Sequence, residues 1–376
     1  MSRQADETVP AQRVGIVGAR GIGPTSAAAL MGARQAVTIW PPRGPVPHPL
    51  ATAPLTAAPL TAESAVAGRF RPALAADAAA LCTAADTTLI AVPANDHRTV
   101  LHAQVPHLRA WQVVIVSSMA SLSALYLHEG ARARGVDATF AAFGTTVLTA
   151  RRPDPCPDLC MVRVMRRRTA LGVAALPLAR TDAVLARCAA LFGTGFSAHS
   201  NMLETVLTNL NPIPQGPLAL FNRTRIERAE AWPQYRYITP RVAAVIEALD
   251  DERQALGAAL GVHVRSLPEH SAQSFGSRAA TLAGIAEELH AGRGRPPGPT
   301  DTNTRLPAED VLVGLALRAE LGRLAGVPMP ATRTVIEAAA LITRRDFRKE
   351  NDLPDQLRLD GTNLQALVAQ VSAGAD

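Results

Sequence analysis

The chain has 376 residues, which at about 150 residues per domain allows two domains with buried cores. Hydrophobic residues make up 48% of the chain and charged residues 19%, a balance that excludes a disordered chain. No apolar run reaches the ~18 residues needed to span a bilayer, and the amino-terminal segment has no hydrophobic secretory signal. These features predict a soluble, cytoplasmic protein that does not bind membranes.

The charged residues are unusual because the basic ones are almost all arginine. The chain carries 38 basic and 32 acidic side chains, for a formal net charge of +6, and Lys349 is the only lysine. Chemistry that needs a buried lysine is therefore nearly excluded. The arginines are scattered apart from the run 166–168, and aromatic residues are only 4%, which argues against nucleic-acid binding. Attraction of an anionic cofactor or substrate is a sufficient use of the surplus charge.

The four cysteines do not form a metal or redox motif. Cys156 and Cys160 are separated by three residues, whereas zinc and redox sites use CxxC, and no second pair or HxxxH completes a ligand set. The sequence therefore predicts ordinary reduced thiols and no metal site.

The first half alternates strand-like and helix-like segments. A short apolar run at 13–17, a small-residue helix at 26–31 and a second strand at 36–40 form a βαβ unit. The Pro/Ala-rich stretch 41–66 is interpreted as a loop or edge-strand elaboration. Further strands are predicted at 87–92, 112–117 and 138–142, with helices at 74–84, 98–107 and 122–134. This alternation predicts a doubly wound Rossmann domain over residues 1–195.

The second half, residues 196–376, has helical periodicity and almost no strand signal. Helices are predicted at 201–210, 240–260, 279–291, 307–325 and 331–344. The predicted fold class is α/β, with an N-terminal doubly wound Rossmann domain followed by an all-α C-terminal domain. The ligand cleft is expected between the two domains.

A glycine-rich turn follows the first predicted strand. Gly18, Gly21 and Gly23 lie between that strand and the first helix, where backbone N–H groups can approach a pyrophosphate. The usual spacing places a glycine at position 20, where this chain has Arg20. We therefore predict a dinucleotide site that includes Arg20 and Ile22, with a purely structural turn as the alternative.

The end of the second predicted strand indicates which dinucleotide is bound. NAD-binding domains usually carry Asp or Glu there for the ribose hydroxyls. This chain has Trp40, two prolines and Arg43, a combination that favours the 2′-phosphate of NADP. NAD remains the alternative.

An ordered set of motifs makes the whole chain resemble the opine (octopine/nopaline) dehydrogenase family. In the first half the motifs are 18–25, 37–40, 92–95 with His97 and Arg98, 116–118 and 144–147. In the second half they are 209–212, 217–220, 222–227, 237–240, 245–250, 252–253, 258–261, 305–311 and 324–328. The resemblance spans about residues 12 to 360.

The resemblance implies an activity and a set of site residues. Family members reductively condense an amino acid with a 2-oxo acid, using a nicotinamide hydride, and Val92, Pro93 and Ala94 would lie beneath the cofactor. In the family an arginine binds a substrate carboxylate and an acidic residue orients a catalytic histidine; the matching positions here are Arg305 and Asp310. A helix cap with a salt bridge is the alternative for these two residues.

The chain departs from the family at the catalytic histidine. The element that begins at Asn211 carries Gln215 where the family has its histidine. An amide hydrogen-bonds but cannot transfer a proton near neutral pH. We expect Asn211 and Gln215 to orient the reacting group, and the condensation role to be lost. His199 and His270 are the alternative histidines in the second half.

Three further residues are candidates for contact with the substrate. Thr145 and Thr146 follow a predicted strand, and Tyr237 lies in one of the few aromatic segments, where packing between helices is the alternative. The sequence as a whole predicts an NADP-dependent oxidoreductase that acts on a C=N or C=O bond of a small carboxylate-bearing substrate. A catalytically degenerate dinucleotide-binding protein and an amine-independent keto-acid reductase remain alternatives, as does a homodimer formed through the helical half.

Overall fold

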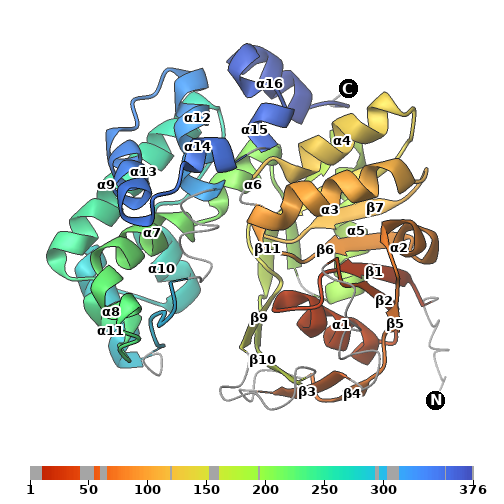
Figure 1. Cartoon of the computed structure of the whole chain (residues 1–376), viewed down its shortest axis with the longest axis horizontal. Helices are drawn as coiled ribbons and strands as arrows, with labels where there is room; N and C mark the ends of the chain where they lie inside the picture. The colour runs from red at the N-terminus through yellow and green to blue at the C-terminus, as the bar shows by residue number, and fades with distance from the viewer. Residues whose placement is uncertain are drawn as a thin grey trace, which may run out of the picture.

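The structure, a computed structural model, has a sheet half and a helical half that lie side by side (Figure 1). It describes residues 11–42, 55–59, 66–118, 121–151, 161–193, 195–292, 296–302, 313–351 and 353–374. Arg43, Arg305 and Asp310, which the sequence assigns to the site, lie outside the described residues, as do Cys156 and Cys160.

The sheet half is built on a sheet of eight described strands in the order β12-β11-β8-β7-β6-β1-β2-β5. The strands are β1 (Arg13–Val17), β2 (Ala36–Trp40), β5 (Ala73–Leu74), β6 (Thr87–Ile90), β7 (Val113–Val116), β8 (Thr139–Phe143), β11 (Ala170–Leu176) and β12 (Gly195–Ala198). Those from β5 to β8 are parallel to one another, and β11 joins β8 in antiparallel register. This confirms the predicted doubly wound Rossmann fold.

Helices cover both faces of this sheet, which explains why its central strands β1, β6 and β7 are almost entirely buried. One buried cluster joins the sheet to α2, α3 and α4, and a second joins it to α1 and α5. The five helices are α1 (Ile22–Gly32), α2 (Ala78–Ala84), α3 (His97–Gln104), α4 (Ser123–Ala133) and α5 (Thr181–Phe192).

A second, smaller sheet lies beside α1 and was not predicted as a sheet. Its described strands run in the order β4-β3-β10-β9. They are β3 (Leu55–Pro59), β4 (Gly68–Phe70), β9 (Leu148–Arg151) and β10 (Met161–Arg167). The sequence indicated an edge elaboration at 41–66 but missed β9 and β10, because their arginines interrupt the apolar runs that mark buried strands.

The other half is helical, as predicted. Its elements are α6 (Met202–Thr208), α7 (Pro212–Phe221), α8 (Arg223–Glu227), α9 (Pro240–Ala259), α10 (Leu267–Phe275), α11 (Leu282–Gly292), α12 (Ala316–Ala325), α13 (Pro330–Thr343), α14 (Phe347–Glu350), α15 (Leu353–Gln356) and α16 (Leu364–Val371). Helices α7 and α10 were not predicted, since their prolines read as breaks in the helical pattern. Among the described helices, none has both the length and the apolar character needed to cross a membrane.

Carboxylates of the long helix α9 cap the N-termini of three other helices. Asp250 accepts a hydrogen bond from the Leu267 N–H at the start of α10 (2.8 Å), and Glu247 accepts one from the Leu282 N–H at the start of α11 (3.2 Å). Glu252 accepts from the N–H groups of Ala331 (2.6 Å) and Thr332 (2.9 Å) in the first turn of α13. The first N–H groups of a helix have no partner within it, and negative charge is favourable there. These carboxylates therefore fix where the three helices begin.

Two fully buried arginines donate hydrogen bonds to the free carbonyls at the C-terminal end of a helix. Arg253 of α9 donates to the Leu207 carbonyl (3.0 Å), and Arg318 of α12 donates to the carbonyls of Val206 (3.1 Å) and Asn209 (2.5 Å). These carbonyls belong to the C-terminal end of α6. The two guanidinium groups therefore fix the turn through which the chain passes from α6 into α7.

The end of the chain returns to the sheet half. After α16, the carbonyls of Ala373 and Gly374 accept hydrogen bonds from the N–H groups of Leu178 and Ala179, each at 2.9 Å. Figure 1 shows α16 close to α4, away from α8 and α11. The division at residue 195 remains a prediction, but this last segment, which it assigns to the helical half, is hydrogen-bonded to the sheet half.

Replacing Glu252 with Ala tests the capping role of α9. The change removes the acceptor for two N–H groups and for the Thr332 hydroxyl (2.6 Å). We expect the free energy of unfolding, measured in urea, to fall by about 2 kcal/mol. Asp251→Ala, at the exposed neighbouring position, should change it by less than about 0.5 kcal/mol. Equal losses in the two variants would contradict the capping role.

Candidate active site

Strand β1 is the point from which successive strands are added to the sheet on opposite sides. The next strand in sequence, β2, pairs on one side of β1, whereas β6 pairs on the other. In doubly wound sheets the ligand crevice lies at the carboxyl ends of the strands where the order reverses. Gly18, Pro41 and Ala91, which follow β1, β2 and β6, therefore border the expected crevice.

The glycine turn after β1 is too crowded for side chains at two positions. Gly18 has a φ of +114°, and a Cβ there would lie 2.8 Å from the Ala91 carbonyl oxygen. A Cβ on Gly23 would lie 2.0 Å from the Gly18 carbonyl oxygen. Gly21 has a φ of +56° but open space around it, and Arg20 is exposed. The turn thus has a compact inner side, while Gly21 and Arg20 lie on its outer side.

This turn fits a dinucleotide pyrophosphate. Helix α1 begins after Gly21, which offers no side-chain cap, and its first turn contains no acidic residue. The Gly23 N–H donates to the Arg20 carbonyl at 3.2 Å, and the helix dipole favours negative charge at this end of α1. Pro24 removes one donor from this turn, and Ile22 packs partly against the core beneath the sheet.

The end of β2 carries no carboxylate. Trp40 is buried, its carbonyl accepts a hydrogen bond from the Gly18 N–H at 2.9 Å, and prolines occupy the next two positions. Asp77 follows β5, the edge strand beside β2. Its side chain is already engaged, because it caps α2 by accepting a hydrogen bond from the Ala80 N–H at 2.8 Å. No described residue at the end of β2 thus offers the acid that usually holds a ribose diol.

A buried histidine holds the loop that follows β6. His97 Nε2 lies 3.2 Å from the Val92 carbonyl oxygen, so this nitrogen carries the proton and donates. Its Nδ1 accepts from the Ser123 hydroxyl at 2.6 Å. Burial lowers the pKa of His97 from 6.5 to about 4, so the ring is neutral at physiological pH. In this loop Val92 is half-buried, Pro93 is exposed and Ala94 is buried.

The loop that follows β8 packs against α6. A Cβ on Gly144 would lie 2.5 Å from the Thr208 hydroxyl, so only glycine permits this approach. Thr145 and Thr146 come next and are half-buried, and the Thr146 carbonyl accepts a hydrogen bond from Arg168 Nε at 2.9 Å. The two threonines therefore lie where the sheet half meets the helical half.

Helix α7 carries Asn211 and Gln215 at its N-terminal end. Both side chains are half-buried, and the Asn211 N–H donates to Asn209 Oδ1 at 3.1 Å. Pro212 begins the helix and is so close to Gly314 that a Cβ on Gly314 would lie 2.3 Å from its ring. Gly314, four residues after Asp310 in the sequence, thus contacts the start of α7.

The remaining candidate, Tyr237, packs within the helical half. Its ring makes an edge contact with Trp232, with 5.5 Å between the centroids, and the Arg225 guanidinium lies 4.3 Å from its centroid. These contacts fit the packing alternative, while the half-buried ring leaves contact with a substrate as a prediction.

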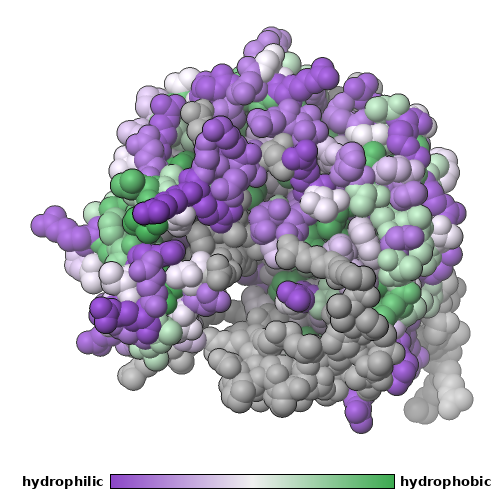
Figure 2. Space-filling view, in the orientation of Figure 1, coloured by the Kyte–Doolittle hydropathy of each residue, from purple (hydrophilic) through white to green (hydrophobic). Residues whose placement is uncertain are grey.

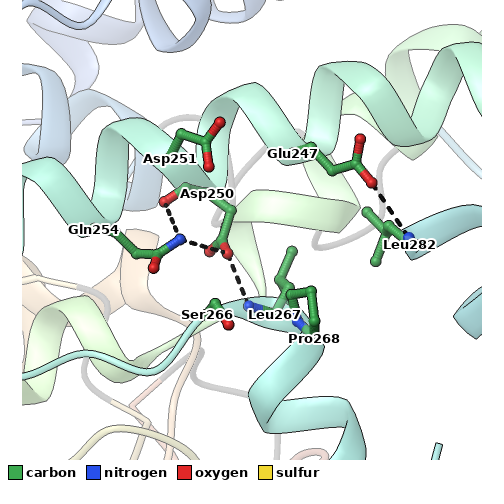
Figure 3. A pocket seen from close by; sticks show the side chains of 8 residues that line it. All are labelled: Glu247, Asp250, Asp251, Gln254, Ser266, Leu267, Pro268 and Leu282. Atoms are coloured by element: carbon green, nitrogen blue, oxygen red, sulfur yellow. Dashed lines mark hydrogen bonds between the residues drawn. The ribbon is translucent and has the colours of Figure 1, made fainter. Parts of the chain in front are cut away.

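A pocket of about 130 Å³ lies on the helical half, between α9 and the starts of α10 and α11 (Figure 3). Its acidic lining includes Asp251 together with Glu247 and Asp250, which are the caps of α11 and α10. The pocket is therefore a consequence of how these helices are joined. Figure 2 shows that hydrophilic residues cover most of the described surface on this face.

The structure brings several predicted residues to one edge of the sheet and adds residues that the sequence did not single out. Gly18, Ala94 and Thr145 follow the carboxyl ends of parallel strands, and Trp40 is the last residue of another, β2. The sequence noted His97 only within a family motif, and it gave Ser123 and Arg318 no role. Ser123 and Arg318 are polar residues in apolar segments, which is the signal that could have marked them as buried and hydrogen-bonded, whereas His97 lies in the polar run 95–99 and carries no such signal.

A Rossmann half with such a glycine turn, joined to a helical half, is the architecture of two-part nicotinamide-dependent dehydrogenases. Residues 198–343 match the family model described as NAD/NADP octopine/nopaline dehydrogenase, alpha-helical domain. The opine dehydrogenase of Arthrobacter sp. (strain 1C) is 31% identical over 279 residues, which cover 74% of this chain and 76% of that protein. The chain therefore belongs to the opine dehydrogenase family, and it is an NAD(P)-dependent dehydrogenase.

Other relatives are more distant. Vitopine synthase of Allorhizobium ampelinum is 26% identical over 209 residues, covering 55% of this chain and 58% of that protein. A solved octopine dehydrogenase with NADH and agmatine superposes with a TM-score of 0.75 at 15% identity, over 96% of this chain and 97% of that one. A yersinopine dehydrogenase with NADP⁺ gives 0.67 at 16% identity, over 97% and 98%. At these identities the solved structures establish the shared fold alone.

The buried His97 predicts a pH dependence of stability. Because its pKa is about 4 in the folded protein and near 6.5 when unfolded, the unfolded chain takes up the proton first as the pH falls. The stabilisation is complete above pH 6.5 and is lost towards pH 4. Between pH 7 and pH 5, wild type should lose about 2 kcal/mol more unfolding free energy than His97→Asn. His102→Asn, at an exposed position of the same helix, is the control and should match wild type.

Proposed function

We propose that the protein uses NADPH to reduce a C=N or C=O bond next to a carboxylate in a small substrate related to amino acids or 2-oxo acids. The nicotinamide ring, when bound, supplies the hydride. The relatives support this substrate class, since solved octopine dehydrogenases hold L-arginine in one complex and pyruvate in another. Membership of the opine dehydrogenase family supports the reaction type.

The main support for the proposal is a buried apolar cluster that the two halves share. Ala94, in the loop after β6, belongs to the same buried cluster as Ile213 and Leu218 of α7. It is the only described residue of the sheet half among the buried members of that cluster. The helix that bears Asn211 and Gln215 therefore shares an apolar core with the edge of the sheet where the cofactor crevice is expected.

The cofactor would be held mainly by backbone groups. Gly18, Gly21 and Gly23 would let the chain approach the pyrophosphate, and the N–H groups of α1 would donate to it. Arg20, exposed beside this turn, supplies a positive charge for a phosphate oxygen. Arg43 would bind the 2′-phosphate, in keeping with the absence of a carboxylate from the described end of β2.

The substrate would be held from both halves. Arg305 would bind the carboxylate through two parallel hydrogen bonds, because a guanidinium presents its donors in a fixed fork. Asp310, which precedes the Gly314–Pro212 contact by a few residues, would orient Gln215. Thr145 and Thr146 would border the reacting group from the sheet half, and Tyr237 would contribute from the helical half.

The chemistry of Gln215 limits the reaction. Its amide can donate a hydrogen bond to a carbonyl oxygen or accept one from an iminium N–H, but it cannot exchange a proton at neutral pH. Condensing an amine with a ketone requires protons to be delivered and water to leave. Hydride addition to an iminium already formed gives a neutral amine directly, with no proton transfer. We therefore propose that the enzyme reduces preformed C=N bonds better than it forms them.

Gln215→His tests this role. We expect wild type to consume NADPH with a preformed cyclic imino acid, and to do so slowly with mixtures of 2-oxo acids and amines. Histidine should raise the rate with the mixtures by roughly 100-fold, the usual contribution of general acid–base catalysis. The measurement is nicotinamide absorbance over a panel of 2-oxo acids, with and without amines.

Two outcomes of this assay would contradict the proposal. If histidine does not raise the rate with the mixtures, Gln215 is not the reason for slow condensation. If wild type consumes NADPH with none of the substrates, the non-catalytic alternative holds. Consumption that is independent of any amine would identify a keto-acid reductase.

Arg43→Ala tests the choice of cofactor. Loss of a charged hydrogen bond to the 2′-phosphate should weaken NADPH binding by roughly 10- to 100-fold and leave NADH binding unchanged. Cofactor fluorescence titrations measure both. Arg34→Ala, at another exposed position of the sheet half, serves as the control. Equal weakening of both cofactors, or of neither, would refute the assignment of Arg43 to the 2′-phosphate.

A further inference from the structure

Three buried polar side chains connect the loops that follow β6 and β7. His97 begins α3, Ser123 begins α4, and Ser121 lies in the loop between β7 and α4. Figure 1 shows α3 and α4 side by side on the same face of the sheet. His97 and Ser123 are 0% exposed, and Ser121 is 1% exposed. The two serine oxygens are 2.5 Å apart, and Ser123 Oγ is 2.6 Å from His97 Nδ1. We refer to these residues as the His–Ser–Ser network.

The direction of each hydrogen bond in the network follows from the Val92 carbonyl. This oxygen can only accept, so His97 Nε2, 3.2 Å away, donates and carries the proton of the neutral ring. Nδ1 then has no proton and accepts from the Ser123 hydroxyl, whose oxygen accepts in turn from Ser121. Each of these protons therefore has one acceptor, and the network has a single arrangement.

The carbonyl that His97 holds belongs to a residue packed against the glycine turn. A Cβ on Gly18 would lie 2.9 Å from Val92 Cγ1 and 2.8 Å from the Ala91 carbonyl oxygen. Two residues further along, Ala94 is buried in the cluster that contains α7. His97 therefore fixes a short loop that contacts the glycine turn on one side and the helical half on the other.

The loop after β7 has a strained backbone where it leaves the strand. Ser118 has a φ of +67°, a conformation that residues other than glycine rarely adopt. One residue earlier, the Ser117 N–H donates to the Ile90 carbonyl at 3.1 Å. Strained residues persist where their surroundings hold them, and they cluster at binding sites. The hydroxyls of Ser121 and Ser123 hold the far end of this loop.

The expected crevice places the nicotinamide half of a dinucleotide over these two loops. The described strands run in the order β7-β6-β1-β2. In a Rossmann domain the pyrophosphate lies at the turn after the first strand, and the adenosine ribose lies at the end of the second. The adenosine would therefore extend toward β2, and the nicotinamide would extend the other way, toward β6 and β7. The His–Ser–Ser network holds the loops on that side.

We propose that His97, Ser121 and Ser123 are positioning residues for the nicotinamide ring, which act by holding the loops after β6 and β7 in the shape that the ring binds. The inference rests on the nicotinamide chemistry of the proposed function and is independent of the substrate. Because all three side chains are buried, they act through the backbone, chiefly through the Val92 carbonyl. A network with a single arrangement specifies one loop position, whereas apolar side chains there would leave the loops without these hydrogen bonds.

A binding experiment without turnover tests the network. NADPH is compared with 2′-phospho-ADP-ribose, which has the same adenosine and pyrophosphate but lacks the nicotinamide. Ser123→Ala should weaken NADPH binding by roughly 10-fold, the effect of one lost hydrogen bond, and change the affinity for the fragment by less than about twofold. Ser121→Ala removes only the last donor of the network and should weaken NADPH binding by about threefold. It decides the question if Ser123→Ala fails to fold.

Two amide substitutions separate the two nitrogens of His97. Glutamine places an N–H group near the position of Nε2 and keeps the bond to Val92, whereas asparagine places its amide near Nδ1 and cannot reach that carbonyl. His97→Gln should keep the NADPH affinity within about threefold of wild type, and His97→Asn should lose roughly 10-fold. The emission of bound NADPH at saturation, which reports on the nicotinamide ring, should fall in His97→Asn and be retained in His97→Gln.

Gln112→Leu is the matched control. This buried side chain lies just before β7, at the opposite end of the strand from the network, and donates to the carbonyls of Cys82 (2.6 Å) and Ala85 (2.8 Å). Its loss should lower the free energy of unfolding and leave the binding of NADPH and of the fragment as in wild type. If Gln112→Leu weakens NADPH binding as much as Ser123→Ala does, the effect follows stability alone and the proposal is wrong.

The same titrations separate this inference from the proposed function. If wild type prefers NADH, the assignment of NADPH fails, and NADH compared with ADP-ribose decides the role of the network. If no substrate consumes either dinucleotide, the proposed reaction fails, and the binding comparison still decides that role. Equal weakening of dinucleotide and fragment in both Ser121→Ala and Ser123→Ala would overturn the inference.

Discussion

The helical half depends on the satisfaction of buried helix ends by charged side chains of α9. A helix end buried without partners for its N–H or C=O groups is costly, and short helices cannot supply those partners themselves. Glu247, Asp250 and Glu252 bind the starts of three helices, and Arg253 binds the end of α6. The sign of each charge matches the helix dipole that it meets. One helix thus determines where four others begin or end.

This constraint extends to the candidate site. The end of α6 is held by two buried guanidinium groups, and the next few residues lead into α7 with Asn211 and Gln215. Close approaches that only glycine allows, at Gly144 and Gly314, fix α6 and α7 against their neighbours. The positions of Asn211 and Gln215 therefore follow from buried charge and backbone contact. A buried ion pair such as Asp250–Arg253 fixes the position of its neighbours, and its net contribution to stability is small.

The sequence was sufficient for the Rossmann half and for the helical character of the rest, because a short apolar run such as β7 and a 20-residue helical pattern such as α9 are clear signals. It missed α7, because three prolines obscure a helix that tertiary contacts stabilise, and it missed β10, because alternating arginines obscure a strand. The glycine turn could be predicted because its glycines follow the first strand at a recognisable spacing within six residues. The roles of Arg253 and Arg318 depend on carbonyls remote in sequence, and His97 depends on the Ser123 hydroxyl 26 residues away, so local patterns do not reveal these partners.

We propose that α6 and α7, held by the charges of α9 and α12, direct Gln215 at the nicotinamide end of the crevice. A crystal structure with NADP⁺ and a carboxylate-bearing substrate tests it most directly. The account predicts the Gln215 amide within about 3.5 Å of the substrate's reacting nitrogen or oxygen, with the pyrophosphate at the glycine turn. A structure in which Gln215 faces away from the nicotinamide, or in which the dinucleotide lies elsewhere, would contradict it.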